Sequence, residues 1–314
     1  MTDDHAQHLA ALHAGFEAPA ELIATAARAV TLSPILSTER IVHGEANEVY
    51  GITFERGPEV ILRLARRAEG VFEKEAWAIG RCRALGIAAP KVLSLQRLQS
   101  GGETLEVCFL EKLPGQLLSA SLSLPQETLR SVVRELGEQI SRMHTVGPGD
   151  LGEAGQFFEN ETDDFLATEA EFVELGGNAG LDRRALERAF RFFEAVMLRR
   201  GPLPRRLTHN DLRACHVLVH EGRLSGVIDF GQVSMDSPVN EFAKWDYWEE
   251  PVRPVAWLQE GYGDKGLFDA GYAELFQAFR IANALWVLRW YALTRHAAGV
   301  SRAAATLARY LGVG

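Results

Sequence analysis

The stretch LTHNDLRACHVLV, from Leu207 to Val219, places His209, Asp211 and His216 close together between two short apolar segments. Taken alone, the stretch allows three interpretations. These side chains, with His220, can bind zinc or a two-metal centre; they can satisfy buried backbone groups; or they can form a catalytic loop. Hydrolytic metal sites usually take further ligands from other strand ends, whereas the remaining histidines lie mostly near the N-terminus.

A second motif distinguishes between these interpretations. The sequence GVIDFG, from Gly226 to Gly231, places Asp229 downstream of Asp211, after a predicted strand–turn–strand unit over Val217–Ile228. In kinases one carboxylate faces the acceptor hydroxyl, and a second, in an Asp-Phe-Gly motif, holds the Mg²⁺ that bridges the phosphates. A tight hairpin brings two such positions to the same cleft. Together the two motifs predict a kinase-like fold.

The N-terminal part of the chain is rich in predicted strands. Apolar residues at helical spacing predict one or two helices within 5–30, and a further helix over Gly70–Gly86. Segments rich in β-branched and aromatic residues predict strands over 40–44, 48–54, Val60–Ala65, Val92–Leu95 and Leu105–Leu110.

The composition changes after EKLPGQ (Glu111–Gln116), where Pro and Gly interrupt the periodicity. Helices are predicted over Gln126–Thr145, Asp163–Leu175, Leu181–Arg199, Val239–Glu250 and most of Asp269–Leu311. We therefore predict an α+β, bilobal, protein-kinase-like fold, with a small antiparallel β-sheet N-lobe containing one main helix and a larger, mostly helical C-lobe. The predicted parts are an N-terminal helical segment (1–35), an N-lobe (36–110), a hinge (111–116) and a C-lobe (117–314).

The composition narrows the class of protein. The 314 residues are 47% hydrophobic and 24% charged, which is typical of a globular enzyme, and the net charge of −9 predicts no binding to nucleic acid or anionic membrane. The apolar stretch Ile281–Leu293 is short for a bilayer and contains Arg289. Three separated cysteines and no signal-peptide pattern predict a cytoplasmic protein with reduced thiols.

Five segments in this order resemble the aminoglycoside phosphotransferase family of kinase-like enzymes: HGEANEVYGITF, VILRLARR, FLEKLPGQ, LTHNDLRACHVLV and GVIDFGQVSMDSPVNEFA. The resemblance spans about Ile41 to Trp248. His216, where most members carry Asn, is similar to the aminoglycoside 2″-phosphotransferase branch, and GEANEVYGITF and VNEFAKWDYW resemble hygromycin B phosphotransferase. The resemblance implies an antibiotic-resistance enzyme that transfers the γ-phosphate of ATP or GTP, with Mg²⁺, to a hydroxyl of an aminoglycoside or aminocyclitol.

The resemblance also implies roles around the two motifs. Asp211 is expected to orient the acceptor hydroxyl and take its proton, and Arg213 to stabilise charge on the transferred phosphoryl group. His216 and Asp229 are expected to ligate Mg²⁺, although imidazole is an uncommon ligand for this ion. Packing of His216 and solvation of Arg213 are the structural alternatives.

A second set of residues is expected to bind the nucleotide. Arg63 occupies the position of the phosphate-binding Lys, and its expected partner is Glu75, with Glu73 as the competing choice. The alternative is that these are ordinary surface charges. Asn47, in the turn HGEANEVYG, is the candidate for cradling phosphates. The purine is expected to meet backbone groups of Glu111 and Leu113, with Leu110 lining the inner wall.

Residues after the metal motif are expected to support the loop and bind the acceptor. In MDSPVNEF, Asp236 is expected to cap a helix and Glu241 to brace the catalytic loop. Acidic and aromatic side chains in WDYWEE are expected to bind a cationic, sugar-like substrate, with Trp245, Asp246, Glu249 and Glu250 as the candidates. The acidic run Asp150–Glu174 is either a second substrate surface or a solvated helix face.

Other functions are compatible with parts of this pattern. An uncharged acceptor, such as a macrolide or a metabolite hydroxyl, is the alternative within enzymes. A nucleotide-binding regulatory domain without turnover is disfavoured by the presence of both Asp211 and Asp229. A protein kinase is disfavoured because only a short segment separates Gly231 from Pro238, where an activation segment is expected.

Overall fold

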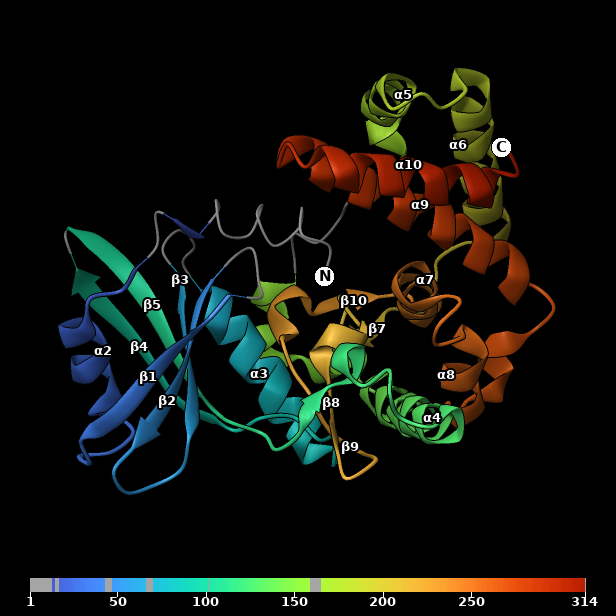
Figure 1. Ribbon diagram of the computed structural model, residues 1–314. Coiled ribbons are helices and arrows are strands. Elements are labelled where there is room, and N and C mark those ends of the chain that lie inside the picture. Colours follow the sequence, from blue (N-terminus) through green and yellow to red (C-terminus); the bar gives the residue numbers. More distant parts are fainter. Residues whose placement is uncertain are drawn as a thin grey trace. The chain divides into compact units, whose positions relative to one another are not determined.

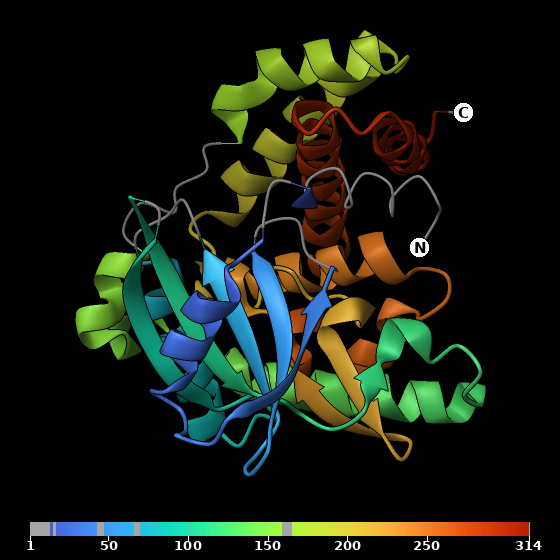
Figure 2. The same cartoon turned by 60° about the vertical axis from the view of Figure 1, so that its left-hand side comes forward.

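The computed structural model describes residues 13–14, 17–42, 47–65, 70–100, 102–158 and 165–313. The chain forms two compact units, shown in Figures 1 and 2, and the chain passes from the first to the second after Gln116. The first unit consists of Met1–Gln116, Leu218–His220 and Ser225–Gly231, and the second of Leu117–Val217, Glu221–Leu224 and Gln232–Gly314.

The first unit is built on a five-stranded antiparallel sheet with the strand order β1-β2-β3-β5-β4. Its strands are β1 (Ile35–Ile41), β2 (Glu48–Phe54), β3 (Val60–Ala65), β4 (Val92–Ser100) and β5 (Glu103–Glu111). Burial alternates along β2, so Tyr50, Ile52 and Phe54 face the core, as expected of a strand with one buried face. The predicted antiparallel sheet is confirmed.

Two helices cover this sheet on opposite faces (Figure 1). Helix α2 (Ala20–Ala27) adds Ile23 and Ala26 to the core formed by residues such as Leu62 and Phe109. Helix α3 (Val71–Ala84), the main helix predicted for this unit, packs near β4 and β5. Helix α3 lies between β3 and β4 in the sequence, so it connects two strands of the same sheet.

The second unit is mostly helical, as predicted. Its helices are α4 (Gln126–Met143), α5 (Glu169–Asn178), α6 (Arg183–Arg200), α7 (Pro238–Glu249), α8 (Val255–Gly261), α9 (Tyr272–Leu293) and α10 (Ala297–Leu311). Aromatic side chains from α5, α6 and α9 form much of its core, among them Phe172, Phe190 and Phe279. Among the described residues, no helix is both long and apolar enough to cross a bilayer.

Short strands flank and connect the two sequence motifs. Strands β7 (Arg206–Thr208) and β10 (Ser234–Asp236) pair antiparallel, on either side of the two motifs. A three-stranded sheet has the order β6-β8-β9, with β6 at Gln116–Leu117, β8 at Val217–His220 and β9 at Arg223–Val227. The hairpin predicted between the motifs is therefore confirmed, whereas β6, β7, β10 and α8 were not predicted.

Most of Asp269–Leu311 is helical, as predicted, and it forms two helices. The chain breaks between α9 and α10, where Arg295 has a positive φ of 57°. His296 is buried at this break, and its amide donates to the carbonyl of Tyr291. The first part of the helix predicted over Asp163–Leu175 falls partly outside the described residues, and α5 begins only at Glu169.

Helices α4 and α8 approach each other at two glycines. A Cβ at Gly137 would lie 2.1 Å from the carbonyl oxygen of Leu258, and a Cβ at Gly261 would lie 1.8 Å from that of Arg134. Both distances are far below van der Waals contact, and a backbone carbonyl cannot rotate away as a side chain can. The two glycines therefore permit the close packing of α4 on α8.

We predict that Gly137→Ala lowers the free energy of unfolding by about 1–3 kcal/mol, because the added methyl group forces the two helices apart. The measurement is urea unfolding followed by circular dichroism. Gly177→Ala is the matched control, since Gly177 is also helical and a Cβ there meets no atom of the described chain within 4 Å. Equal stability of the Gly137→Ala variant and the wild type would contradict the packing described here.

Candidate active site

A buried guanidinium joins three elements of the first unit. Arg63, in β3, is 7% exposed; its Nη1 donates to Oε1 of Glu75 in α3, and its Nη2 donates to Oδ1 of Asp229 at 2.9 Å. Burial alone would lower the pKa of Arg63, but the two carboxylates raise it above its ordinary value. Glu73, the competing partner, instead contacts the exposed Arg97 at 3.1 Å. Glu75 is therefore the carboxylate that pairs with Arg63.

Asp229 has an unusual backbone conformation. Its φ is 64°, in the left-handed region that residues with a Cβ rarely adopt, and such residues concentrate at functional sites. The side chain is 39% exposed although it pairs with the buried Arg63. A carboxylate held by a buried cation and still open to solvent is suited to binding a cationic ligand. Phe230, which follows, is buried in the core.

The linker after β5 lies against strand β9 within the same unit. A Cβ at Gly226 would come 2.3 Å from Cδ1 of Leu113, so the Leu113 side chain lies directly on that glycine. The hydroxyl of Ser225 donates to the carbonyl of Pro114 at 2.7 Å. These contacts place Leu113 beside the strand that ends just before Asp229.

The other residues expected to bind nucleotide are also in this unit. Leu110 is buried near the end of β5. Backbone groups of Glu111 were expected to contact the purine. The amide of Glu111 instead donates to the carbonyl of Lys91 at 2.9 Å, within the fold. Asn47 is half-buried and lies two residues before Val49, the partner of Arg63 in the β2–β3 ladder. The rest of the expected phosphate turn, 43–46, lies outside the described residues.

In the second unit, Asp211 contacts two other residues of the predicted site, Arg213 and His216. Arg213 Nη2 donates to Oδ2 of Asp211 at 3.1 Å, and its guanidinium lies over the ring of Trp248, 4.9 Å from the centroid. Nδ1 of His216 lies 2.8 Å from the backbone oxygen of Asp211. Because a carbonyl can only accept, Nδ1 carries the proton, and Nε2 is the acceptor in the neutral ring.

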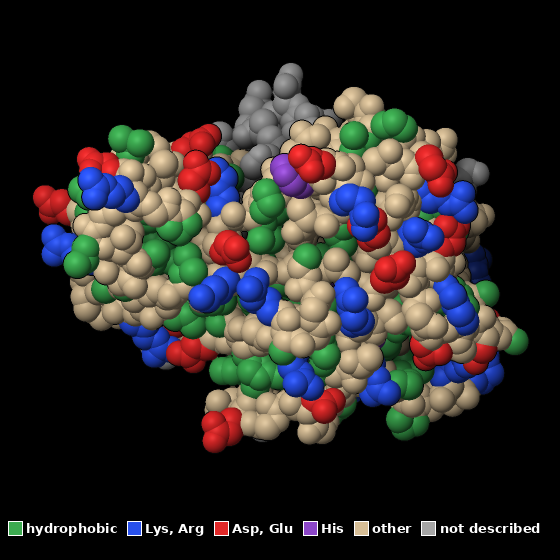
Figure 3. All heavy atoms as spheres, turned by 90° about the horizontal axis from the view of Figure 1, so that it is seen from below, with side chains coloured by type: hydrophobic (Ala, Val, Ile, Leu, Met, Phe, Trp, Pro, Cys, Tyr) green, Lys and Arg blue, Asp and Glu red, His purple; other side chains and the backbone are tan. Residues whose placement is uncertain are grey.

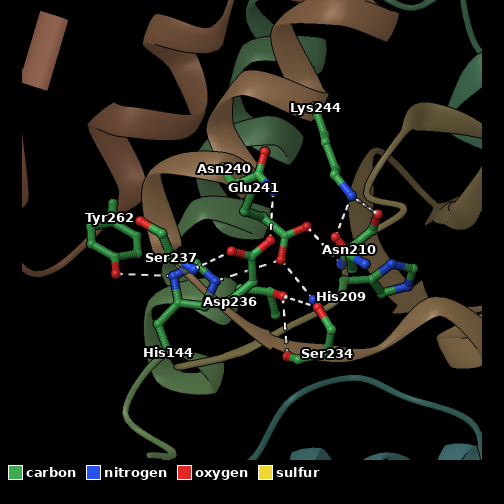
Figure 4. Close-up of polar contacts among 11 residues, drawn as sticks. His144, His209, Asn210, Ser234, Asp236, Ser237, Asn240, Glu241, Lys244 and Tyr262 are labelled. Carbon is green, nitrogen blue, oxygen red and sulfur yellow. Dashed lines mark hydrogen bonds and ion pairs between the residues drawn. The ribbon is translucent and has the colours of Figure 1, made fainter. Parts of the chain in front are cut away.

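Glu241 holds the backbone just before Asp211 (Figure 4). Its carboxylate accepts from the amide of His209 at 2.6 Å and from that of Asn210 at 3.1 Å. Burial alone would raise the pKa of Glu241, but the hydrogen bond and charge of His144, with a further contribution from His209, lower it below the ordinary value. The predicted bracing role of Glu241 is confirmed.

Asp236 precedes the N-cap position of α7, which is Ser237. Ser237 immediately precedes α7, and the carboxylate of Asp236 accepts from the Ser237 amide at 2.6 Å and from the Asn240 side chain at 2.5 Å (Figure 4). Asp236 thus ties the strand β10 to the first turn of the helix. The expected cap is corrected to this neighbouring role.

Two of the expected substrate residues are structural. Trp245 is 0% exposed, and its indole donates to the backbone oxygen of Arg253 at 2.9 Å. Asp246 is 4% exposed, contacts Arg280 at 2.8 Å and accepts from the hydroxyl of Tyr310 at 2.7 Å. The expectation that they contact substrate is corrected, because both point into the interior of the second unit.

The other two have internal partners as well. Glu249 is buried, and it accepts from the amide of Ala214 at 2.7 Å and from Arg253 at 2.6 Å. Glu249 therefore supports the backbone of the loop at Ala214, and its expected contact with substrate is corrected to this structural role. Glu250 is half-buried and accepts from the amide of Val255 at 2.9 Å.

On one face of the molecule, charges of both signs are mixed (Figure 3). On the face shown in Figure 3, Lys and Arg side chains are interspersed with Asp and Glu side chains. Within the acidic run Asp150–Glu174, residues 159–164 lie outside the described chain, and Glu171 pairs with Arg289 at 2.6 Å. In the described residues no three His, Cys, Asp or Glu side chains converge as a metal cluster.

Sequence reasoning missed two residues of α7 that contact the catalytic loop. Lys244 donates to the backbone oxygen of Asn210 at 2.8 Å, and Trp248 lies against Arg213. Glu241, Lys244 and Trp248 follow the spacing i, i+3, i+7, so they share one face of the helix. This spacing is the signal in the sequence that identifies the face of α7 turned toward the loop.

Comparison with known proteins was consistent with this geometry. A sequence model described as the phosphotransferase enzyme family matches residues 37–276, most of the chain. A search of curated proteins found no match. Among solved structures, a thermostable mutant of aminoglycoside phosphotransferase APH(4)-Ia, in a ternary complex with ADP and hygromycin B, is 17% identical, with coverage of 89% of this chain and 95% of that chain and a TM-score of 0.66.

Two further structures have the same fold. The GDP complex of wild-type aminoglycoside 2'-phosphotransferase-IIIa is 17% identical, covering 88% of this chain and 93% of that chain with a TM-score of 0.71. The GDP and kanamycin complex of APH(2")-IIIa is 15% identical, covering 98% and 97% with a TM-score of 0.65. At these identities the likeness shows the fold, and it confirms the predicted kinase-like architecture.

We predict that Glu241→Gln lowers the free energy of unfolding by about 1–3 kcal/mol at neutral pH, because the amides of His209 and Asn210 bond to different carboxylate oxygens and Gln replaces one of these acceptors with an NH2 donor. The pKa of Glu241 is lower in the folded chain, so its contribution is present in full above the ordinary value of about 4.5 and is lost as the pH falls through the folded value. The difference between wild type and variant should therefore shrink in acid.

Urea unfolding at a series of pH values measures this difference. Glu187→Gln is the control. Glu187, in α6, has a side chain that is 36% exposed and forms an ion pair with the exposed Arg183. A stability difference for Glu241→Gln that stays constant from neutral pH to well below 4.5 would contradict the role of its charge.

Proposed function

Because the chain belongs to the phosphotransferase enzyme family, we propose that it is a small-molecule O-kinase that transfers the γ-phosphate of ATP or GTP to a hydroxyl of an aminoglycoside or aminocyclitol. The observation that carries the proposal is the buried Arg63, held by Glu75 and Asp229 in one unit. Similar solved structures contain ADP or GDP, with hygromycin B or kanamycin in two of them.

The first unit supplies the nucleotide side of this proposal. Arg63 is permanently charged, and its fork of N–H groups matches phosphate oxygens. Glu75 holds the guanidinium in place from α3. Asn47 and the backbone around it are proposed to contact phosphates, and Leu110 and Leu113 to line the purine site. Side chains in a purine site need only be apolar, so ATP and GTP both remain donors in the proposal.

Magnesium fits the donor groups in part. The half-exposed carboxylate of Asp229 is a hard, anionic oxygen ligand of the type that Mg²⁺ prefers. His216 would offer Nε2, which is a weaker match for this ion. When bound, Mg²⁺ neutralises charge on the phosphates during transfer. We therefore propose Asp229 as the principal ligand and His216 as a secondary one.

Asp211 is proposed to act on the acceptor. The acceptor oxygen forms a bond to the γ-phosphorus as the bond from phosphorus to the β–γ bridging oxygen breaks, and the hydroxyl proton passes to the Asp211 carboxylate. Arg213 holds that carboxylate and adds positive charge for the transferred group. Trp248 restricts the guanidinium of Arg213 by stacking on it.

One observation favours an acceptor without positive charges as the second candidate. Trp245, Asp246 and Glu249, expected to recognise a polycation, are buried with internal partners. A macrolide or a metabolite hydroxyl would not need those carboxylates. Non-catalytic nucleotide binding is the weaker alternative, because Asp211 and Asp229 are both present with their supporting contacts.

We predict that the purified protein with Mg²⁺ transfers phosphate from ATP or GTP to at least one member of an aminoglycoside and hygromycin panel. Macrolides and simple amino alcohols complete the panel, and product phosphorylation is measured by mass spectrometry. Transfer only to acceptors without cations would replace the first candidate by the second. Nucleotide binding without transfer to any acceptor would instead favour the regulatory alternative.

We predict that Asp211→Asn lowers kcat by about 10²–10⁴, the usual scale for loss of a general base. Nucleotide binding, measured by calorimetry, should be unchanged, because the nucleotide residues lie in the other unit. Full turnover by the variant would remove Asp211 from the mechanism. Loss of folding is tested separately by circular dichroism.

A further inference from the structure

The residue before Asp211 has a strained backbone. Asn210 has a φ of 63°, in the left-handed region, which is unfavourable for residues with a Cβ and tolerated best by Asn and Asp among them. Such a conformation persists only where neighbouring contacts hold it. Those contacts come from one helix, α7, and they involve both backbone groups of Asn210.

The contacts lie one turn apart on α7 (Figure 4). Oε1 of Glu241 accepts from the Asn210 amide at 3.1 Å. Nζ of Lys244 donates to the Asn210 carbonyl oxygen at 2.8 Å and also to the Asn210 side-chain oxygen Oδ1. An ammonium has three N–H donors, so one lysine can hold both oxygens at once.

We propose that Lys244 is a positioning residue for phosphoryl transfer. By binding the two oxygens of Asn210, its ammonium holds Asn210 in the left-handed conformation and so fixes the direction in which Asp211 leaves the chain. This inference rests on the proposed role of Asp211 as the proton acceptor. Lys244 is proposed to act through its two hydrogen bonds to Asn210.

The physical reason lies in the backbone. Without the ammonium, the carbonyl oxygen and Oδ1 of Asn210 lose their hydrogen bonds to Lys244. The residue can then relax toward negative φ, where most residues are more stable. That change rotates the peptide that joins Asn210 to Asp211 and moves the carboxylate. A displacement of about 1 Å at a reacting group can cost about 10²-fold in rate. Nucleotide binding does not depend on this peptide in the proposal.

The first test compares lysine variants. Lys244→Met should lower kcat by about 10–100-fold while the KM for nucleotide changes less than about twofold. Lys244→Arg, which retains several donors, should keep most of the activity. Lys265→Met is the matched control, since Lys265 Nζ also donates to two backbone oxygens, those of Gln259 at 2.7 Å and Glu260 at 3.0 Å, away from Asp211.

The second test is rescue by glycine. Glycine adopts positive φ without a steric cost, so Asn210→Gly added to Lys244→Met should recover about tenfold in kcat. A merely structural role of Lys244 predicts no such recovery, and predicts that melting temperature, kcat and nucleotide affinity fall together. Unchanged kcat in Lys244→Met, a parallel fall, or no rescue would each overturn the proposal. If Lys244→Met does not fold, Lys244→Gln takes its place.

A third measurement separates this inference from the proposed function. Hydrogen–deuterium exchange of the peptide 207–217 should be faster in Lys244→Met than in the wild type, and unchanged in Lys265→Met. If the wild type transfers phosphate to no acceptor but this difference is observed, the proposed function fails and the holding of the loop stands. If exchange is unchanged in Lys244→Met, the positioning role fails whatever the activity.

Discussion

The first unit is organised around the need to keep a buried guanidinium paired. Arg63 lies in the middle of the sheet, where an unpaired charge would cost several kcal/mol. Glu75 and Asp229 remove that cost, and in doing so they fix α3 and the end of the β8–β9 hairpin against β3. The same ion pairs that make the buried charge tolerable place the arginine and the carboxylate that are proposed to bind phosphate and metal. Stability and the proposed nucleotide site therefore have one physical origin.

The second unit solves a comparable problem with backbone groups. The turn at His209 and Asn210 exposes two successive amides that no strand or helix can satisfy, and the buried carboxylate of Glu241 accepts from both. The adjacent turns of α7 add Lys244 on the carbonyl of Asn210 and Trp248 on Arg213. One helix face thus determines the geometry of the loop before and after Asp211. The loop is irregular in conformation, yet its backbone amides at His209 and Asn210 both have side-chain acceptors.

Much of the fold was predictable because its signals are local. Val60–Ala65 was predicted as a strand with the bounds that the structure has, since its β-branched residues fit a buried sheet. Strands β7 and β10 were not predicted, because three residues are too few to show a period. The break at Arg295 was missed for a different reason. Residues 293–296 contain neither Pro nor Gly, so the sequence has no local signal for the break.

The residues of the site were predictable only where they belong to sequence motifs with a fixed order and spacing. The pairing of Arg63 with Glu75 and the bracing by Glu241 follow from motifs whose spacing is fixed by the fold. The residues after Glu241 were misjudged, because acidic and aromatic composition does not reveal which face of a helix is buried. The relevant information is the phase of the helix relative to Glu241, which turns Lys244 and Trp248 toward the loop and Trp245 into the core. Trp245 and Asp246 serve the interior of the second unit, whereas Glu241, Lys244 and Trp248 of the same helix serve the loop, so one helix divides its faces between the core and the loop.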